Sequence, residues 1–217
     1  MLGRLRHCVL AFGLFLALSG LSSNADSATF EAGGLSFSDE LGGFRLISAS
    51  GQGTPADPIV LIEELTSLNP AVLTIRQAGS STARSPAQSV LLRSLVKVVI
   101  NRSAWRWSGF DLELRGAGGR ASIYTDGLSF DQLRMVRQPL SSDQFAEIRT
   151  QDEPFDRLQF DHGRVEPDQT VRLGFNIVDI NPHAIFYLAQ EPIVLMAERE
   201  DAPVSQHFVY AAYAFGP

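Results

Sequence analysis

The sequence predicts an all-β protein, an antiparallel β-sandwich of jelly-roll-like or immunoglobulin-like form with little helix. Apolar and polar residues alternate over many short segments, which is the period of a strand with one face on a core. Glycine, proline, aspartate and serine separate these segments at spacings of roughly 8 to 15 residues. Strands without intervening helices are typical of a sandwich or a barrel, and we favour the sandwich.

The segment 170–179 shows the strand pattern most clearly. Its residues Val171, Leu173 and Phe175 point to one face, while the polar residues between them point to the other. Turn residues such as Asp126-Gly127 bound these segments. The predicted strands, in chain order, are 44–49, 59–65, 71–77, 91–101, 105–115, 121–125, 155–161, 170–179, 184–190, 193–197 and 207–215.

Residues 1–25 have the composition of a secretory signal peptide. Arg4 and Arg6 precede an apolar run over 8–18, and small polar residues follow it. The run is too short to cross a bilayer as a helix, which takes roughly 20 apolar residues. We therefore expect cleavage near residue 26, release into the periplasm or the medium, and a single domain over 26–217.

Charge and cysteine content exclude several classes of protein. The chain has 18 Lys and Arg against 24 Asp and Glu, a net charge of −6, and no basic stripe, so nucleic-acid binding is not expected. Its one cysteine, Cys8, lies within the predicted signal peptide, so the mature chain would hold no disulfide. No later apolar run is long enough for a membrane-spanning helix. Lys97 is the only lysine, which we interpret as a compositional habit.

Three stretches of the second half resemble exported bacterial β-sandwich domains found in secreted or surface-sorted proteins. They combine apolar alternation with turn residues, and the resemblance implies a fold and not an activity. The residues that carry it are Asn101, Trp105, Trp107, Phe110, Leu112, Glu113 and Leu114, then Phe155-Asp156-x-Leu158-x-Phe160-x-x-Gly163-x-Val165-x-Pro167, then Phe186-Tyr187-Leu188-x-Gln190-x-Pro192.

Trp105 and Trp107 form the sharpest local feature for ligand binding. Residues two apart on a strand project from the same face about 6.6 Å apart. If the strand continues without interruption, the two indoles share a face with Asp111 and Glu113. The rings would stack on sugar rings and the carboxylates would accept hydrogen bonds from hydroxyls. A bulge at Gly109 would instead turn both tryptophans into the core. The sequence leaves both alternatives open.

Acidic residues beside predicted turns suggest a calcium site. Calcium takes six to eight oxygen ligands, which in sandwiches can come from loops at one end. The candidate ligands are Asp161, Asp179 and Asn181. No Asp-x-Asp-x-Asp-Gly run is present, so solvated loop carboxylates are the alternative.

These features together predict an exported, non-catalytic binding or structural module of the bacterial envelope, with a polysaccharide or an envelope protein as partner. No catalytic residue is predicted, because the His-Glu-x-x-His and Gly-x-Ser-x-Gly motifs are absent. One alternative is an interaction module that pairs strands through the apolar segment 207–215. The other is a glycan-active hydrolase, in which two carboxylates face each other across a cleft at about 5 to 9.5 Å.

Overall fold

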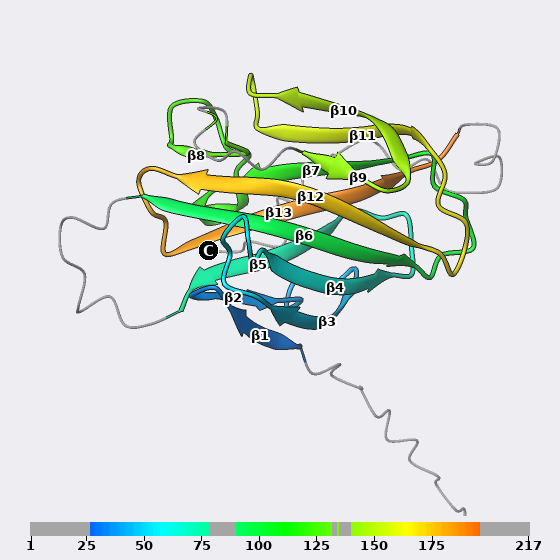
Figure 1. The fold of residues 1–217 in the computed structure, drawn as a ribbon, viewed down its shortest axis with the longest axis horizontal. Coiled ribbons are helices and arrows are strands. Elements are labelled where there is room, and N and C mark those ends of the chain that lie inside the picture. The colour runs from blue at the N-terminus through cyan, green and yellow to red at the C-terminus, as the bar shows by residue number, and fades with distance from the viewer. Residues whose placement is uncertain (1–26, 79–89, 132–133, 135–139, 196–217) are drawn as a thin grey trace, which may run out of the picture.

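A computed structural model describes residues 27–78, 90–131, 134 and 140–195 of the chain. These residues form two β-sheets packed face to face (Figure 1). The predicted β-sandwich is therefore confirmed. The predicted signal peptide, most of the segment 78–88 and the predicted strand 207–215 lie outside the described residues.

Each sheet is built from strands that are far apart in the sequence. Sheet A contains, in spatial order, β1 (Thr29–Ala32), β2 (Leu35–Ser38), β5 (Ala71–Gln77), β13 (Ile185–Ile193), β7 (Gly109–Arg115), β11 (Arg157–Gly163) and β10 (Phe145–Gln151). Sheet B contains β3 (Arg45–Ser50), β4 (Ile59–Leu65), β6 (Leu91–Asn101), β12 (Thr170–Asp179) and β8 (Leu128–Ser129), with β9 (Ser141–Ser142) also paired to β12. A short 3₁₀ turn, η2 (Ala117–Gly119), follows β7.

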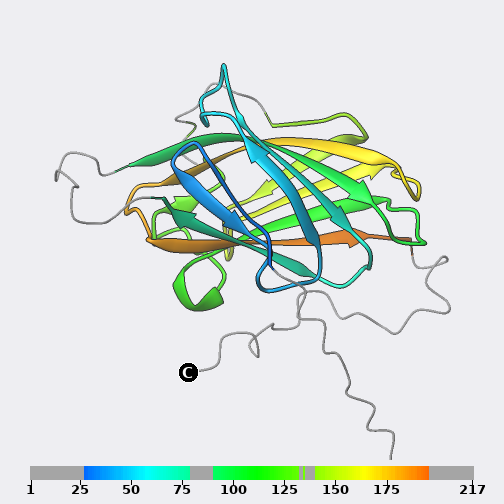
Figure 2. The same cartoon turned by 90° about the horizontal axis from the view of Figure 1, so that it is seen from below.

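Neighbouring strands are antiparallel except for β4 and β6, which run parallel with Ile59 beside Leu95. The chain makes this parallel pair because β5, which lies between them in sequence, belongs to sheet A. Between β4 and β6 the chain therefore crosses from sheet B to sheet A and back. Figure 2 shows β6 and β12 in one layer and β5 with β13 in the other.

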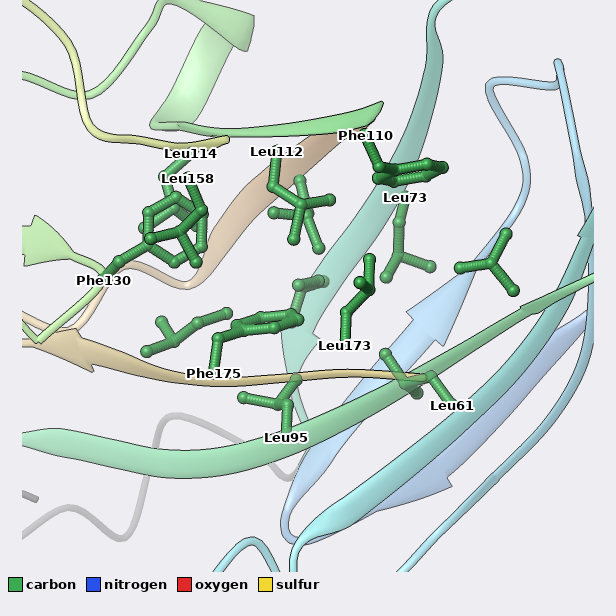
Figure 3. Close-up of a cluster of buried hydrophobic side chains, with 14 of the residues drawn as sticks. Leu61, Leu73, Leu95, Phe110, Leu112, Leu114, Phe130, Leu158, Leu173 and Phe175 are labelled. Atoms are coloured by element: carbon green, nitrogen blue, oxygen red, sulfur yellow. The ribbon is translucent and has the colours of Figure 1, made fainter. Parts of the chain in front are cut away.

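The core lies between the sheets and follows from strand alternation. Leu173 and Phe175 of β12 are fully buried and point toward Phe110 and Leu112 of β7 in the facing sheet (Figure 3). Burying one such side chain contributes about 1.5–3 kcal/mol. Residues from both sheets belong to one continuous hydrophobic cluster, and a small second cluster of Val72, Tyr187 and Ala189 is separate from it.

Trp107 lies inside this core and not on an exposed strand face. Its exposed fraction is 0%, its ring centroid is 5.7 Å from that of Phe110, and its Nε1 donates a hydrogen bond to Ser103 Oγ at 3.2 Å. Trp105 is half-buried and packs against the same cluster. The alternative in which Trp105 and Trp107 share an exposed face therefore does not hold for Trp107.

The physical reason is an interruption before β7. The strand begins only at Gly109, and Ser108 forms a bend, so Trp107 and Phe110 both point inward although they are three apart. A Cβ on Gly109 would lie 2.9 Å from the Phe160 carbonyl oxygen, which explains glycine at this close approach of β7 and β11. The alternative of a break in alternation at this glycine is confirmed for Trp107.

Several other elements differ from the sequence prediction. Residues 121–125 form no strand and contribute only a bridge between Ala121 and Arg115. Strand β13 runs without a break to Ile193, where two strands were predicted. The strands β1, β2 and β10 were not predicted, because they are short or largely exposed.

We predict that the two tryptophans of the chain report different environments. A Trp105→Phe variant leaves Trp107, whose emission should be blue-shifted and protected from iodide because the ring is buried. A Trp107→Phe variant leaves the half-buried Trp105, whose emission should be redder and more easily quenched. Red-shifted, quenchable emission from Trp105→Phe would contradict the burial of Trp107.

Candidate functional site

An open pocket of about 500 Å³ lies between two loops, residues 121–126 after β7 and residues 152–156 between β10 and β11. Its lining residues are Ile123, Tyr124, Thr125, Glu153 and Pro154. Ile123 and Tyr124 have exposed fractions of 46% and 51%, and the neighbouring Phe155 has 36%. Exposed large apolar side chains therefore gather around this pocket.

Backbone hydrogen bonds to the end of β7 position both loops. Leu114 N donates to Asp156 O at 3.1 Å, and Leu114 O accepts from Ser122 N at 2.9 Å. Asp156 N in turn donates to Ser122 O at 3.2 Å. The two pocket walls are thus fixed to the same core residue of sheet A and to each other.

The Asp126-Gly127 turn closes the first loop at the residues predicted from the sequence. The two carboxylate oxygens of Asp126 accept hydrogen bonds from Ile123 N at 3.1 Å and Leu128 N at 2.9 Å. Gly127 has φ of 92°, and a Cβ there would lie 2.7 Å from Ile180 Cγ1. Glycine is required here for two reasons: other residues avoid this positive φ, and their Cβ would clash with Ile180.

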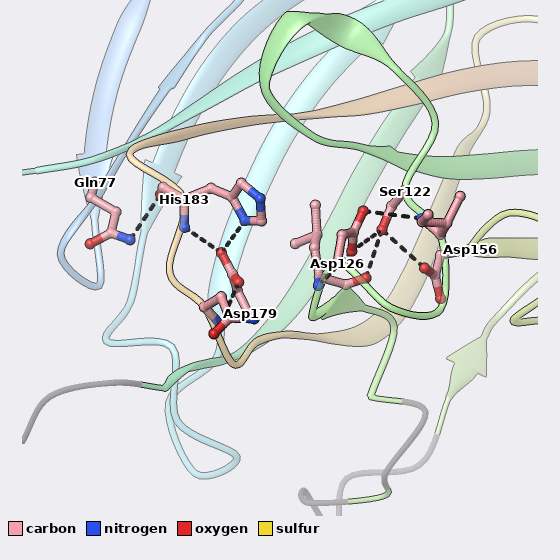
Figure 4. A network of polar contacts seen from close by, with 9 residues as sticks. Gln77, Ser122, Asp126, Asp156, Asp179 and His183 are labelled. Carbon is pink, nitrogen blue, oxygen red and sulfur yellow. Dashed lines mark hydrogen bonds and ion pairs between the residues drawn. The ribbon is translucent and has the colours of Figure 1, made fainter.

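Behind the pocket, the hydroxyl of Ser122 faces three acceptors (Figure 4). Ser122 Oγ lies 2.7 Å from Leu128 O, 3.0 Å from Asp126 Oδ1 and 3.0 Å from Asp156 Oδ2. A hydroxyl carries one proton and can donate only one full hydrogen bond. A protonated Asp156 would supply a second proton to this cluster by donating from Oδ2 to Ser122 Oγ.

The burial of Asp156 favours this protonated form. Its exposed fraction is 1%, and its Oδ1 accepts no hydrogen bond from any residue that the structure describes. Desolvation raises the pKa of Asp156 to about 7, opposed by the hydrogen bond from Ser122 and reinforced by the charges of Asp126 and Asp152. A carboxyl that titrates near neutral pH thus lies directly behind the loops that form the pocket.

The candidate calcium ligands are not brought together. Asp179 is fully buried at the end of β12, where its carboxylate accepts hydrogen bonds from Asn181 N at 3.1 Å and from His183 N at 2.6 Å (Figure 4). Its Oδ2 also lies 2.9 Å from His183 Nδ1. Asp161 lies in β11 of the other sheet and forms an ion pair with Arg149. Within the described ranges, no cluster of three His, Cys, Asp or Glu side chains could hold a metal.

The carboxylates predicted to accept sugar hydroxyls already have protein partners. Glu113 on β7 accepts hydrogen bonds from Arg115 Nε at 2.8 Å and from Arg157 Nε at 2.7 Å, and its exposed fraction is 2%. Asp111 lies 3.5 Å from Gln159 Nε2 on β11. These acids stand on the outer face of sheet A, whereas Trp107 points into the core, so the four predicted ligand-binding residues do not form one surface.

Sequence reasoning did not select Tyr124, Glu153 or Asp156 for the site. The pattern of residues 121–125 predicts a strand. The only sequence signal at the second loop is the acidic pair Asp152-Glu153 at a predicted turn. Ser122 and Asp156 are 34 residues apart, and their contact depends on how β7 and β11 pair.

Comparisons with family models, curated proteins and solved structures found no match to this chain. Among the described residues, no helix has the length and apolar character needed to span a membrane. The site must therefore be interpreted from its own geometry.

We predict that Asp156→Asn raises the free energy of unfolding at pH 8 and leaves it nearly unchanged at pH 4. The pKa of Asp156 is about 7 in the folded protein against 3.8 for an ordinary aspartate. The Asp156 carboxyl therefore contributes fully to the free energy of unfolding below about pH 4. As the pH rises toward 7, this contribution falls by about 1.4 kcal/mol per pH unit. Asparagine keeps a donor toward Ser122 and cannot ionise. Urea unfolding at pH 4 to 8 measures the difference.

Asp126→Asn is a second variant for this experiment. Asp126 accepts two backbone hydrogen bonds, so the amide should weaken the turn. Losing the charge of Asp126 should also lower the pKa of Asp156, so the loss of stability between pH 4 and pH 8 should be smaller than in the wild type. An Asp156→Asn variant whose stability difference from the wild type does not change with pH would contradict a protonated Asp156.

Proposed function

We propose that the protein is an exported, non-catalytic binding module whose pocket between loops 121–126 and 152–156 takes a hydroxyl-rich ligand, an oligosaccharide. The observation that carries this proposal is the open pocket whose lining residues include the exposed Tyr124 together with Thr125 and Glu153. The proposal keeps the ligand class expected from the sequence and moves the site away from Trp105 and Trp107.

The lining residues match the chemistry of a sugar. An aromatic face packs against the C–H groups of a pyranose ring, and hydroxyl and carboxylate oxygens hydrogen-bond its hydroxyls. Glu153 is the one ionisable side chain that could charge the lining near neutral pH, and it is acidic, so anionic ligands such as phosphates are disfavoured. A rigid binding surface is also supported, because both loops are hydrogen-bonded to Leu114.

Binding is better supported than glycoside hydrolysis. A glycosidase needs two carboxyl groups that flank the scissile bond on opposite sides. Of the carboxyl groups near this pocket, only Glu153 lines it, and Asp156 is buried behind the wall. The described pocket therefore offers one reactive carboxylate where hydrolysis requires a pair.

Strand pairing is a second candidate function, with β10 as its location. β10 is the last strand of sheet A in the described structure, and six of its seven residues are exposed or half-exposed, as is typical of an edge strand. Glu147 and Arg149 on this strand form ion pairs with the neighbouring β11, however, and charged edge residues discourage non-specific pairing. We therefore place the pocket ahead of the edge.

Residues 1–25 support export, so the proposed ligand would be met in the periplasm or outside the cell. A polysaccharide of the envelope or of the surroundings is the corresponding partner. The acidic net charge of −6 gives no support for a nucleic-acid partner.

We predict that Tyr124→Ala weakens oligosaccharide binding about fivefold or more. The measurement is calorimetric titration of the purified protein with cello-, chito- and malto-oligosaccharides, with Kd compared between wild type and variant. Removing the ring takes away the stacking surface while leaving the loop backbone in place, and an aromatic contact of this kind is worth about 1 kcal/mol or more.

Phe155→Ala is the matched control, because Phe155 is an exposed ring on the second loop that does not line the pocket. It should bind with the wild-type Kd. Equal losses in both variants, or no binding of any of the three sugar series by the wild type, would contradict the proposal.

A further inference from the structure

Five of the six exposed large apolar side chains of the described residues lie at the end of the sandwich that contains the pocket. The sixth, Leu195, lies at the other end, because β13 ends beside the start of β7 and the pocket loop follows the end of β7. Single exposed apolar residues are normal, but a contiguous group of them marks an interaction site. The five, which we call the apolar rim, are Val90, Ile123, Tyr124, Phe155 and Ile180.

Strand pairing brings Val90 and Ile180 together. Leu91 of β6 is aligned with Asp179 of β12, so Val90 and Ile180, the residues just outside this pair, leave sheet B at the same end. Ile180 N donates a hydrogen bond to Gly127 O at 2.9 Å. The turn after β12 is therefore held against the turn that closes the first pocket loop (Figure 4).

The pocket connects this pair to the other three side chains of the rim. Ile123 and Tyr124 line one wall, and Phe155 directly follows the residues that line the other. A saccharide in the pocket would cover Ile123 and Tyr124. Val90, Phe155 and Ile180 do not line the pocket and would stay in water. A saccharide therefore accounts for only part of this apolar surface, and a ligand with an adjoining apolar part would account for all of it.

The charges at this end favour a neutral surface over an anionic one. In the loop after β7, the loop between β10 and β11 and the turn after β12, Asp152 and Glu153 are exposed acids and Arg120 is the one arginine. Anionic lipid surfaces attract clusters of basic residues, which these loops lack. Burial of apolar side chains needs no charge and remains as the driving force.

The arrangement of the rim fits a lipid surface better than a protein groove. Its side chains stand on separate loops that leave both sheets, on both sides of an open pocket. A protein partner would need a matched cavity for each of them. The interfacial region of a bilayer takes up separate apolar side chains together, and tyrosine is enriched there, because its ring is apolar and its hydroxyl meets water.

We propose that the pocket and the apolar rim together bind a glycolipid in a membrane surface. The neutral saccharide head group enters the pocket, and the rim side chains contact the lipid around it. This inference rests on the proposed saccharide function of the pocket and names the form in which the saccharide is met. The sandwich binds end-on, so Leu195 at the far end points away from the membrane.

The first experiment is flotation of the protein with phosphatidylcholine vesicles that carry hexadecyl glycosides of cellobiose, chitobiose or maltose. The protein is purified without residues 1–25, whose apolar run would itself bind lipid. We expect it to float with the vesicles whose head group matches the oligosaccharide series bound in solution, and to remain unbound with plain phosphatidylcholine vesicles. Equal flotation with plain vesicles would overturn the proposal in favour of a bare lipid surface.

Ile180→Ser tests the rim and leaves the pocket lining intact. We expect its apparent Kd for the glycoside vesicles to rise about fivefold, because a half-exposed isoleucine no longer enters the lipid. Its Kd for the free oligosaccharide should stay at the wild-type value. Phe155→Ala should behave in the same way, and circular dichroism checks the folding of both variants. Wild-type vesicle binding by both variants would overturn the proposal.

Leu195→Ser is the matched control, since it makes a similar change at a side chain with an exposed fraction of 56% at the opposite end. It should bind both vesicles and free oligosaccharide as the wild type does. A loss of vesicle binding equal to that of Ile180→Ser would overturn the end-on arrangement.

Binding of free oligosaccharide separates the failure of this inference from the failure of the proposed function. A protein that binds a free oligosaccharide but floats with none of the three glycoside vesicles keeps its saccharide pocket and overturns the glycolipid proposal. A protein that binds neither the free sugars nor the vesicles overturns both.

Discussion

Packing of side chains between the two sheets is the interaction on which the rest of the structure depends. The ladder hydrogen bonds run within each sheet, so packing of the inner faces is the main interaction that holds sheet A against sheet B. Each long strand must therefore turn alternate side chains inward. This rule places Lys97 between Leu95 and Val99 on the inner face of β6. It also directs Leu112 and Leu114 of β7 inward, and the backbone of Leu114 then holds both pocket loops.

The sequence predicts the fold well where that rule applies without interruption. β4, β5, β6 and β12 lie at their predicted residues, because each is a long apolar run bounded by turn residues. It fails where burial is weak or the alternation breaks. β10 has only Phe145 and Ile148 as large apolar residues, and one bend at Ser108 reverses the direction of Trp107. The site could not be predicted, because Ser122 and Asp156 meet only through the pairing of β7 and β11.

Two buried carboxyls in this protein differ in the number of donors that they meet. Asp156 and Asp179 are both almost fully buried, with exposed fractions of 1% and 0%. Asp179 accepts two backbone hydrogen bonds and lies beside the His183 ring. Asp156 has a single hydroxyl neighbour that is shared with two other acceptors, so desolvation dominates and its pKa rises. The raised pKa of Asp156 therefore follows from burial together with a shortage of donors beside its carboxyl.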